Sequence, residues 1–242
     1  ATVALSGECA DEVFGGYPWF HARELLYAGA FPWSRNPEER TAMMSEDLAK
    51  AVKPAEYAAE RYDETIREVP FLEGESDLEK RRREMFYLNF TWFMQTLLER
   101  KDRMSMAHGL EVRVPYCDHR LVQYVWNIPW EMKMLGGREK GLLRKALEGV
   151  LPDDVLYRKK SPYPKTHNPA YEKLVKQRLM EILHDPNSSL LPLVNKKTLL
   201  AMMSEPSDLA RPWFGQLMAR PQLYAYLLQV EAWLRKYRVT II

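Results

Sequence analysis

The 242-residue chain carries 35 Lys and Arg against 33 Asp and Glu, a formal net charge of +2. This balance excludes a strongly basic surface for nucleic acid or an anionic membrane, and we expect a small ligand instead. No apolar run reaches the roughly 18 to 20 residues that cross a bilayer. With only two cysteines, Cys9 and Cys117, in a chain that can bury a core, we expect reduced thiols and a cytoplasmic protein.

The chain opens on an apolar segment, residues 1–5, whose composition predicts a buried strand. No Met precedes it, and chains rarely begin inside a core strand. We therefore expect a fragment whose preceding strands and loops are missing. An acidic, glycine-rich turn follows at 6–17.

Most of the remaining sequence has helical periodicity. The predicted helices cover 23–27, 45–50, 55–67, 77–106, 118–126, 138–150, 170–184, 196–204 and 221–237. The segment 77–106 is the strongest, because Ser76 and Glu79 have capping-box spacing and apolar side chains recur every three or four residues. An extended piece is predicted at 112–115, a proline-rich loop at 161–169 and a surface break at 185–189. The pattern is typical of a mainly α chain with one or two short N-terminal strands.

Three carboxylates, Glu8, Asp11 and Glu12, lie within five residues after the predicted strand. Ligands of open α/β sheets bind at the carboxyl ends of strands. Carboxylates this close repel one another, and a divalent cation or a proton transfer makes the placement tolerable. The alternative is that Asp11 or Glu12 caps the following helix, which requires only one oxygen. We favour the chemical role and keep the cap as the alternative.

Three blocks, in this order, resemble the asparagine synthetase family: LSGECADEVFGGY at 5–17, DRMSMAHGLEVRVP at 102–115 and LPDDVLYRKK at 151–160. Cys9 stands where the family usually has Gly. The resemblance implies that 1–242 is the helical C-terminal portion of an α/β adenine-nucleotide alpha-hydrolase-like (ATP pyrophosphatase) synthetase domain, with 185–242 as its helical tail. The family's Ser-Gly-Gly-x-Asp-Ser phosphate loop and its N-terminal glutaminase domain do not occur in these residues.

The resemblance also implies an activity: ATP-dependent conversion of aspartate to asparagine through a β-aspartyl-adenylate, which glutamine-derived ammonia attacks, giving AMP and pyrophosphate. In this reading Glu8 accepts a proton from ammonia, Lys160 contacts the departing phosphates and Asp11 helps to hold Mg²⁺ on pyrophosphate. The residues expected to bind substrate or cofactor are Ser6, Gly7, Asp11, Glu12, Gly15, Gly16 and Tyr17.

The implied cofactors are ATP and Mg²⁺, and the implied partners are aspartate, ammonia and the glutaminase domain, with no nucleic acid and no membrane. A homodimer is left open. We expect residues 1–242 alone to be inactive, because half of the phosphate cradle and the ammonia source are absent from them.

The block at 102–115 favours a structural role. Gly109 is expected to form a turn, Glu111 and Arg113 a partly buried ion pair, and Asp118 an N-cap. Two other functions stay open. One is a related amide-forming enzyme, such as a β-lactam synthetase or an amidotransferase, although such relatives often replace the glutamate at the position of Glu8. The other is a helical interaction module without chemistry.

Overall fold

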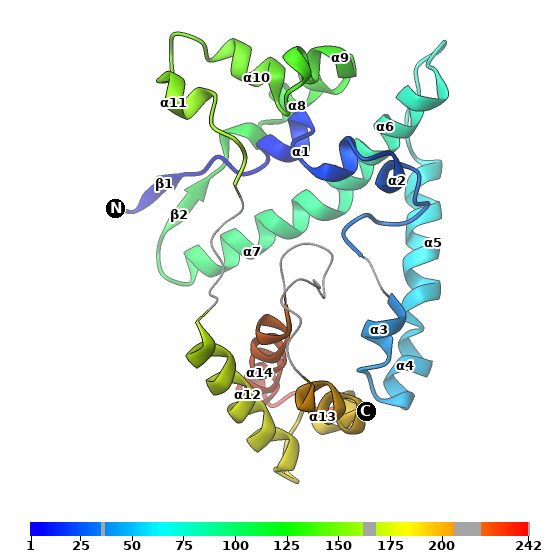
Figure 1. The fold of residues 1–242 in the computed structure, drawn as a ribbon, viewed down its shortest axis with the longest axis vertical. Helices are drawn as coiled ribbons and strands as arrows, with labels where there is room; N and C mark the ends of the chain where they lie inside the picture. Colours follow the sequence, from blue (N-terminus) through cyan, green and yellow to red (C-terminus); the bar gives the residue numbers. More distant parts are fainter. Residues whose placement is uncertain (35–36, 162–167, 206–218, 242) are drawn as a thin grey trace. The chain divides into compact units, whose positions relative to one another are not determined.

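The computed structural model describes residues 1–34, 37–161, 168–205 and 219–241. Within them the chain is mainly helical, with two short strands, as the sequence predicts (Figure 1). The backbone forms two compact units. Unit 1 contains Ala1–Gly29 and Tyr62–Ser161, and unit 2 contains Ala30–Arg61 and Pro162–Ile242. None of the described helices combines the length and the apolar character needed to cross a membrane.

The two strands of unit 1 pair in parallel. Strand β1 is Val3–Leu5 and β2 is Glu111–Arg113, with Ala4 opposite Val112. The prediction of a buried strand was wrong, since the Leu5 side chain is 75% exposed. Among the described residues β2 is the only strand beside β1, so the side chains on either side of Ala4 remain open to solvent.

The other elements of unit 1 are helical. They are α1 Ala10–Phe14, η1 Pro18–Phe20, α2 Arg23–Leu26, α6 Asp77–Leu88, η2 Asn89–Met94, α7 Gln95–Met106, η3 Pro115–Cys117, α8 His119–Trp126, α9 Trp130–Lys133, η4 Leu135–Gly137, α10 Gly141–Ala146 and α11 Asp153–Leu156. Three of them, α6, η2 and α7, follow one another directly and form one long helix, and the rest are short. Helix α5, Pro54–Arg67, crosses the boundary between the units.

The long helix predicted at 77–106 is confirmed, with one interruption. Its capping box forms, because Ser76 N donates to Glu79 Oε2 at 2.8 Å and Glu79 N donates to Ser76 Oγ at 3.3 Å. Between α6 and α7 the backbone widens to a π-helix over Asn89–Met94. Asn89 is fully buried, and its side chain donates to Met85 O at 2.8 Å, so a polar group enters the helical ladder where the backbone widens.

The helix predicted at 138–150 is much shorter than expected. Only α10, Gly141–Ala146, is helical, because Lys140 has a left-handed backbone with φ of 58°. A helix cannot continue through such a residue. Arg144 stabilises the irregular flanks, donating to Glu139 O at 3.0 Å and also to Leu156 O. The short helices α9 and α11 were not predicted.

The core of unit 1 supports the acidic turn. Helix α1 buries Val13 and Phe14 against Val125 of α8. The predicted N-cap of α8 is confirmed, since Asp118 Oδ1 accepts from Arg120 N at 2.9 Å. These contacts fasten the segment after β1 to the unit, so the carboxylates of the turn have fixed directions.

The ion pair between Glu111 and Arg113 forms, with Nε and Oε1 2.7 Å apart, but it is not partly buried as expected. The two side chains are 50% and 62% exposed. Residues i and i+2 of a strand share one face, and this face of β2 is open. Gly109 has φ of 69° and forms the expected turn.

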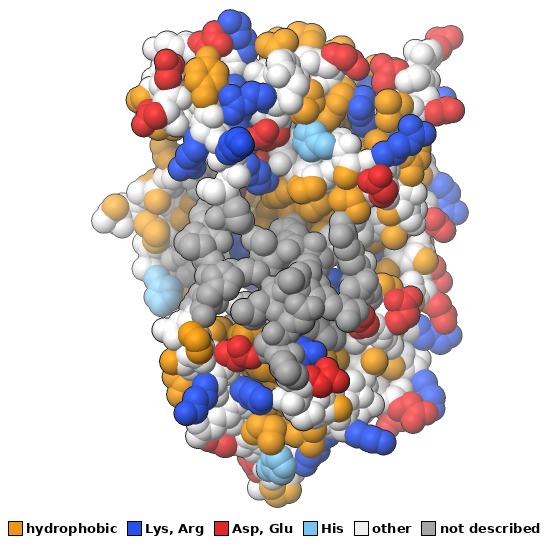
Figure 2. Space-filling model, viewed as in Figure 1, with side chains coloured by type: hydrophobic (Ala, Val, Ile, Leu, Met, Phe, Trp, Pro, Cys, Tyr) orange, Lys and Arg blue, Asp and Glu red, His pale blue; other side chains and the backbone are white. Residues whose placement is uncertain are grey.

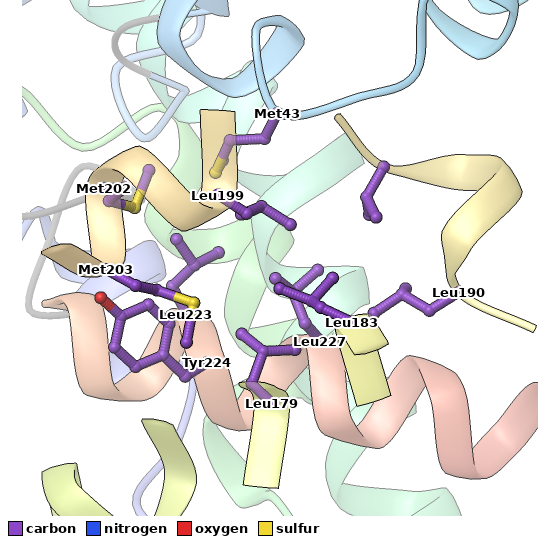
Figure 3. Packing of buried hydrophobic residues seen from close by; sticks show 11 residues of the cluster. Met43, Leu179, Leu183, Leu190, Leu199, Met202, Met203, Leu223, Tyr224 and Leu227 are labelled. Carbon is purple, nitrogen blue, oxygen red and sulfur yellow. The ribbon is translucent and has the colours of Figure 1, made fainter. Parts of the chain in front are cut away.

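Unit 2 is a cluster of helices: α3 Pro37–Thr41, α4 Glu46–Val52, α12 Pro169–His184, η5 Leu191–Leu193, α13 Lys196–Ser204 and α14 Arg220–Tyr237. The helices predicted at 45–50, 170–184, 196–204 and 221–237 are confirmed within two residues. Figure 3 shows their core, in which Leu179 and Leu183 of α12 face Leu223 and Leu227 of α14.

The predicted break at 185–189 is an ordered turn. The buried carboxylate of Glu231 accepts from Leu190 N at 2.7 Å and from Ser188 Oγ at 3.3 Å. The charge of Glu231 is matched by Arg235. Of the loop predicted at 161–169, residues 162–167 lie outside the described residues.

Candidate functional site

Glu8 follows β1 and has a carboxylate that is 14% exposed. Lys101 Nζ of α7 lies 2.9 Å from Glu8 Oε2, and Arg100 Nη2 lies 3.4 Å from Glu8 Oε1. Lys101 Nζ donates to Ser6 Oγ at 3.0 Å, and that hydroxyl oxygen also accepts from Glu8 N at 3.3 Å. Within the described part of the chain, no donor forms an aligned hydrogen bond with the buried atom Glu8 Oε2. Each oxygen of the Glu8 carboxylate therefore lies near a cation.

Asp11, on α1, is held by two lysines. Lys140 Nζ donates to Asp11 Oδ1 at 2.7 Å, and Lys160 Nζ donates to Asp11 Oδ2 at 2.9 Å. Burial alone would raise the pKa of Asp11, but the hydrogen bonds and charges of Lys140 and then Lys160 outweigh it, so the pKa lies below its usual value. Asp11 therefore stays ionised and keeps two ammonium groups side by side.

Glu12 points into unit 1 and is 1% exposed. The Tyr17 hydroxyl donates to Glu12 Oε1 at 2.7 Å. Burial raises the pKa of Glu12, although the Tyr17 hydrogen bond opposes the rise. The Tyr17 ring stacks on Trp19 with centroids 4.4 Å apart, and Lys160 Nζ lies 4.2 Å from the same ring. Lys160 thus packs on the Tyr17 ring, and Glu12 holds the Tyr17 hydroxyl.

The three carboxylates of the turn diverge, each toward its own partners. The described residues contain no group of three or more His, Cys, Asp or Glu side chains that could hold a metal ion. Mg²⁺ commonly binds one or two carboxylates and takes its other oxygens from phosphates and water. Asp11 alone fits such a shared site. It does not fit a metal centre formed by protein side chains only.

Two glycines after α1 permit this geometry. Gly15 has φ of 73°, and a Cβ there would lie 2.6 Å from the Trp130 ring. A Cβ on Gly16 would overlap Asp11 Oδ1 and lie 2.7 Å from Asp11 Cγ. Gly16 also contributes its carbonyl, which accepts from Lys160 Nζ at 3.1 Å. Gly7, in contrast, has open space around it.

Lys160 also lines a cationic cavity of about 660 Å³, whose other lining residues are Arg138, Glu139, Tyr157 and Lys159. In Figure 2, Lys and Arg side chains gather on the visible face of unit 1 near α10 and α11. Arg138 Nη2 donates to Tyr157 O at 2.7 Å, which ties the segment before α10 to the segment after α11. This tie holds Lys159 and Lys160 near the acidic turn.

The sequence predicts Glu8, Asp11 and Lys160 as site residues, and it does not predict Lys140 and Lys101, which contact Asp11 and Glu8. Lys140 is 129 residues from Asp11 and was placed inside a predicted helix, where its left-handed backbone could not be foreseen. Lys101 lies in a charged helical stretch and has no distinguishing spacing. The available signal for Lys140 was the glycine pair before it, which interrupts helical periodicity.

Cys9 has φ of 72°, a left-handed conformation that favours glycine. This explains why glycine suits the position. Cys9 is buried beside Cys117, and burial raises the pKa of both thiols. Both cysteines are free, as expected.

The comparisons with known proteins agree with these features. The family model described as asparagine synthase matches residues 1–235. Over 240 residues the chain is 56% identical to glutamine-hydrolyzing asparagine synthetase 3 of Bacillus subtilis. This match covers 99% of this chain and 39% of that protein. It is 31% identical over 197 residues to glutamine-hydrolyzing asparagine synthetase 1 of the same organism, covering 67% of this chain and 30% of that protein.

A shorter match of 67 residues, 45% identical, is to the glutamine-hydrolyzing asparagine synthetase of Mesocricetus auratus, covering 26% of this chain and 12% of the relative. The chain thus spans about two-fifths of the length of the first Bacillus relative. Because the family model covers nearly all of the chain, the chain belongs to the asparagine synthase family.

Proposed function

We propose that this chain forms the part of a glutamine-hydrolysing asparagine synthetase that activates aspartate with ATP and forms the amide. The observation that carries the proposal is the arrangement at the acidic turn. A glutamate paired with Lys101 and Arg100 stands three residues before a carboxylate that holds two lysines. The glutamate suits proton acceptance, and the two lysines suit the binding of a polyanion such as pyrophosphate.

In the first step, the β-carboxylate of aspartate attacks the α-phosphorus of ATP, and the bond to pyrophosphate breaks. Lys160 and Lys140 offset the negative charge that grows on pyrophosphate, with Arg138 and Lys159 beside them. Before substrate binds, Asp11 holds the two ammonium groups in position. The cationic side chains are therefore in place when the phosphates arrive.

In the second step, ammonia attacks the acyl carbon of β-aspartyl-adenylate, the bond from that carbon to the AMP oxygen breaks, and Glu8 takes a proton from the nitrogen. A correctly placed carboxylate can accept this proton. Asp11 is held by two lysines and Glu12 is 1% exposed, which favours Glu8 among the carboxylates of the turn as the base. Ser6 and Gly7 flank the Glu8 backbone, and Gly7 leaves space for substrate.

Mg²⁺ bound with the phosphates would supply further positive charge, and Asp11 is the residue that would contribute a carboxylate oxygen to it. Glu12, Gly15, Gly16 and Tyr17 would act by supporting Asp11 and Lys160, because their contacts are with these two residues or with the core. ATP and Mg²⁺ therefore remain the proposed cofactors.

The proposed domain is residues 1–242 as the helical portion of an α/β ATP pyrophosphatase-like domain, with 185–242 as its tail. Aspartate and ATP are its proposed substrates, and a glutaminase domain is the proposed source of ammonia. The test is asparagine formation by the complete encoded protein from aspartate, ATP and ammonium. One AMP and one pyrophosphate per asparagine are expected. ATP consumption without asparagine, or an amide of another acid, would contradict the proposal.

A further inference from the structure

Helix α7 brings the ammonium group of a lysine to Glu8. Lys101 Nζ lies 2.9 Å from Glu8 Oε2, a distance typical of a charged hydrogen bond. The same ammonium, which carries three protons, also donates to Ser6 Oγ at 3.0 Å. Lys101 thus pairs with the buried oxygen Oε2 of Glu8 and binds the serine beside it.

The Glu8–Lys101 ion pair is largely buried, which strengthens the interaction between the two charges. The side chains of Glu8 and Lys101 are 14% and 25% exposed, whereas Arg100, the other cation near Glu8, is 58% exposed and lies 3.4 Å from the opposite oxygen. Charge pairs that are largely shielded from water interact more strongly than exposed ones. Lys101 is therefore the main cationic neighbour of the carboxylate.

The hydrogen bonds also restrict the direction of the carboxylate. Ser6 Oγ accepts from both Lys101 Nζ and Glu8 N, so the serine links the lysine to the backbone that carries Glu8. Because Ser6 N donates to Arg113 O at 2.9 Å, this linkage is anchored to β2. The side chain of Glu8 is held from the helix side and from the strand side together.

We propose that Lys101 is a positioning residue for amide formation: through its charge and its hydrogen bond to Ser6 it fixes the direction of the Glu8 carboxylate. This inference rests on the proposed function, in which Glu8 is the base. Lys101 touches neither the adenylate nor the phosphates in this role. Its loss should affect the second step and spare the first.

The test uses the complete encoded protein with aspartate, ATP and ammonium, and measures pyrophosphate and asparagine formed in the first turnover. In Lys101→Met we expect the pyrophosphate burst to persist, while asparagine per pyrophosphate falls at least about tenfold, because base catalysis contributes roughly a hundredfold or more. The control is Arg103→Met on the same helix. Arg103 is 76% exposed and pairs only with the exposed Glu99 among described residues. Its product ratio should match that of the wild type.

A second comparison tests whether Lys101 acts through Glu8. Adding Lys101→Met to Glu8→Gln should lower asparagine formation no further, because the base is already absent. An additional tenfold loss in the double variant would overturn the inference. An unchanged product ratio in Lys101→Met, or an equal loss of both products while Arg103→Met keeps both, would also overturn it. Wild-type protein that makes pyrophosphate but no asparagine would instead remove the proposed function, and the inference with it.

Discussion

Lys133 is buried in unit 1, where its ammonium group contacts an aromatic ring and a backbone carbonyl, and this predicts a pH-dependent stability. Its side chain is 3% exposed, with Nζ 4.3 Å from the centroid of the Phe86 ring and 3.4 Å from Trp126 O. Burial, and then the charge of Arg83, lowers the pKa of Lys133 from 10.5 to about 7. The folded chain therefore releases a proton that the unfolded chain keeps.

The direction in which stability changes with pH follows from the number of protons that the folded and unfolded states bind. Between pH 7 and pH 10.5 the unfolded lysine is protonated and the folded one is largely not, so raising the pH stabilises the folded state. One proton corresponds to a slope of up to about 1.4 kcal/mol per pH unit, and the whole window to at most about 5 kcal/mol in the free energy of unfolding. Below pH 7 both states bind the proton and the slope disappears.

The measurement is urea unfolding at a series of pH values from 7 to 10.5, for the wild type and for Lys133→Met. The thioether side chain has similar length and no charge, so this variant should lack the slope and be more stable near pH 7. Lys145→Met is the matched control, because Lys145 is 62% exposed and pairs with Glu148. The reasoning fails if the pH dependence of the wild type equals that of Lys133→Met.

The other predictions concern the acidic turn. Gly16→Ala should lower ATP–pyrophosphate exchange by about a hundredfold, since the added Cβ overlaps the Asp11 carboxylate that holds both lysines. Exchange at the wild-type rate would contradict that placement. Lys160→Ala should slow adenylation by roughly a hundred- to a thousandfold while glutaminase activity is kept. Pyrophosphate release near the wild-type rate would transfer this role to Lys159. Cys9→Gly should change the free energy of unfolding by less than about 1 kcal/mol, because relief of left-handed strain offsets lost packing, whereas Cys9→Val should cost about 2 kcal/mol or more. Chemical unfolding tests this, and equal stability of the two variants would refute it.

Local signals in the sequence predicted most of the helices. The capping box of Ser76 and Glu79, the N-cap of Asp118 and the apolar spacing of α12 to α14 act within a few residues, so they can be read without the fold. The failures have tertiary causes. The long helix widens to a π-helix that begins at buried Asn89, and Lys140 leaves helical geometry where its side chain binds Asp11.

The candidate site was predicted in part. Glu8, Asp11 and Lys160 stand in motifs, whereas Lys101 and Lys140 reach the turn from segments more than ninety residues away. Composition could not separate these two from the other lysines on charged helices. The separate directions of the three carboxylates also depend on packing, since Glu12 turns inward only because α1 lies on the core.

The most direct test of Glu8 as the base is a first-turnover comparison of pyrophosphate and asparagine in Glu8→Gln, using the complete encoded protein with ammonium. Glutamine keeps the size of the side chain but cannot accept the proton. We predict a normal burst of pyrophosphate with little asparagine, and accumulation of the adenylate. An equal loss of both products would contradict the base role and leave Glu8 as a binding residue.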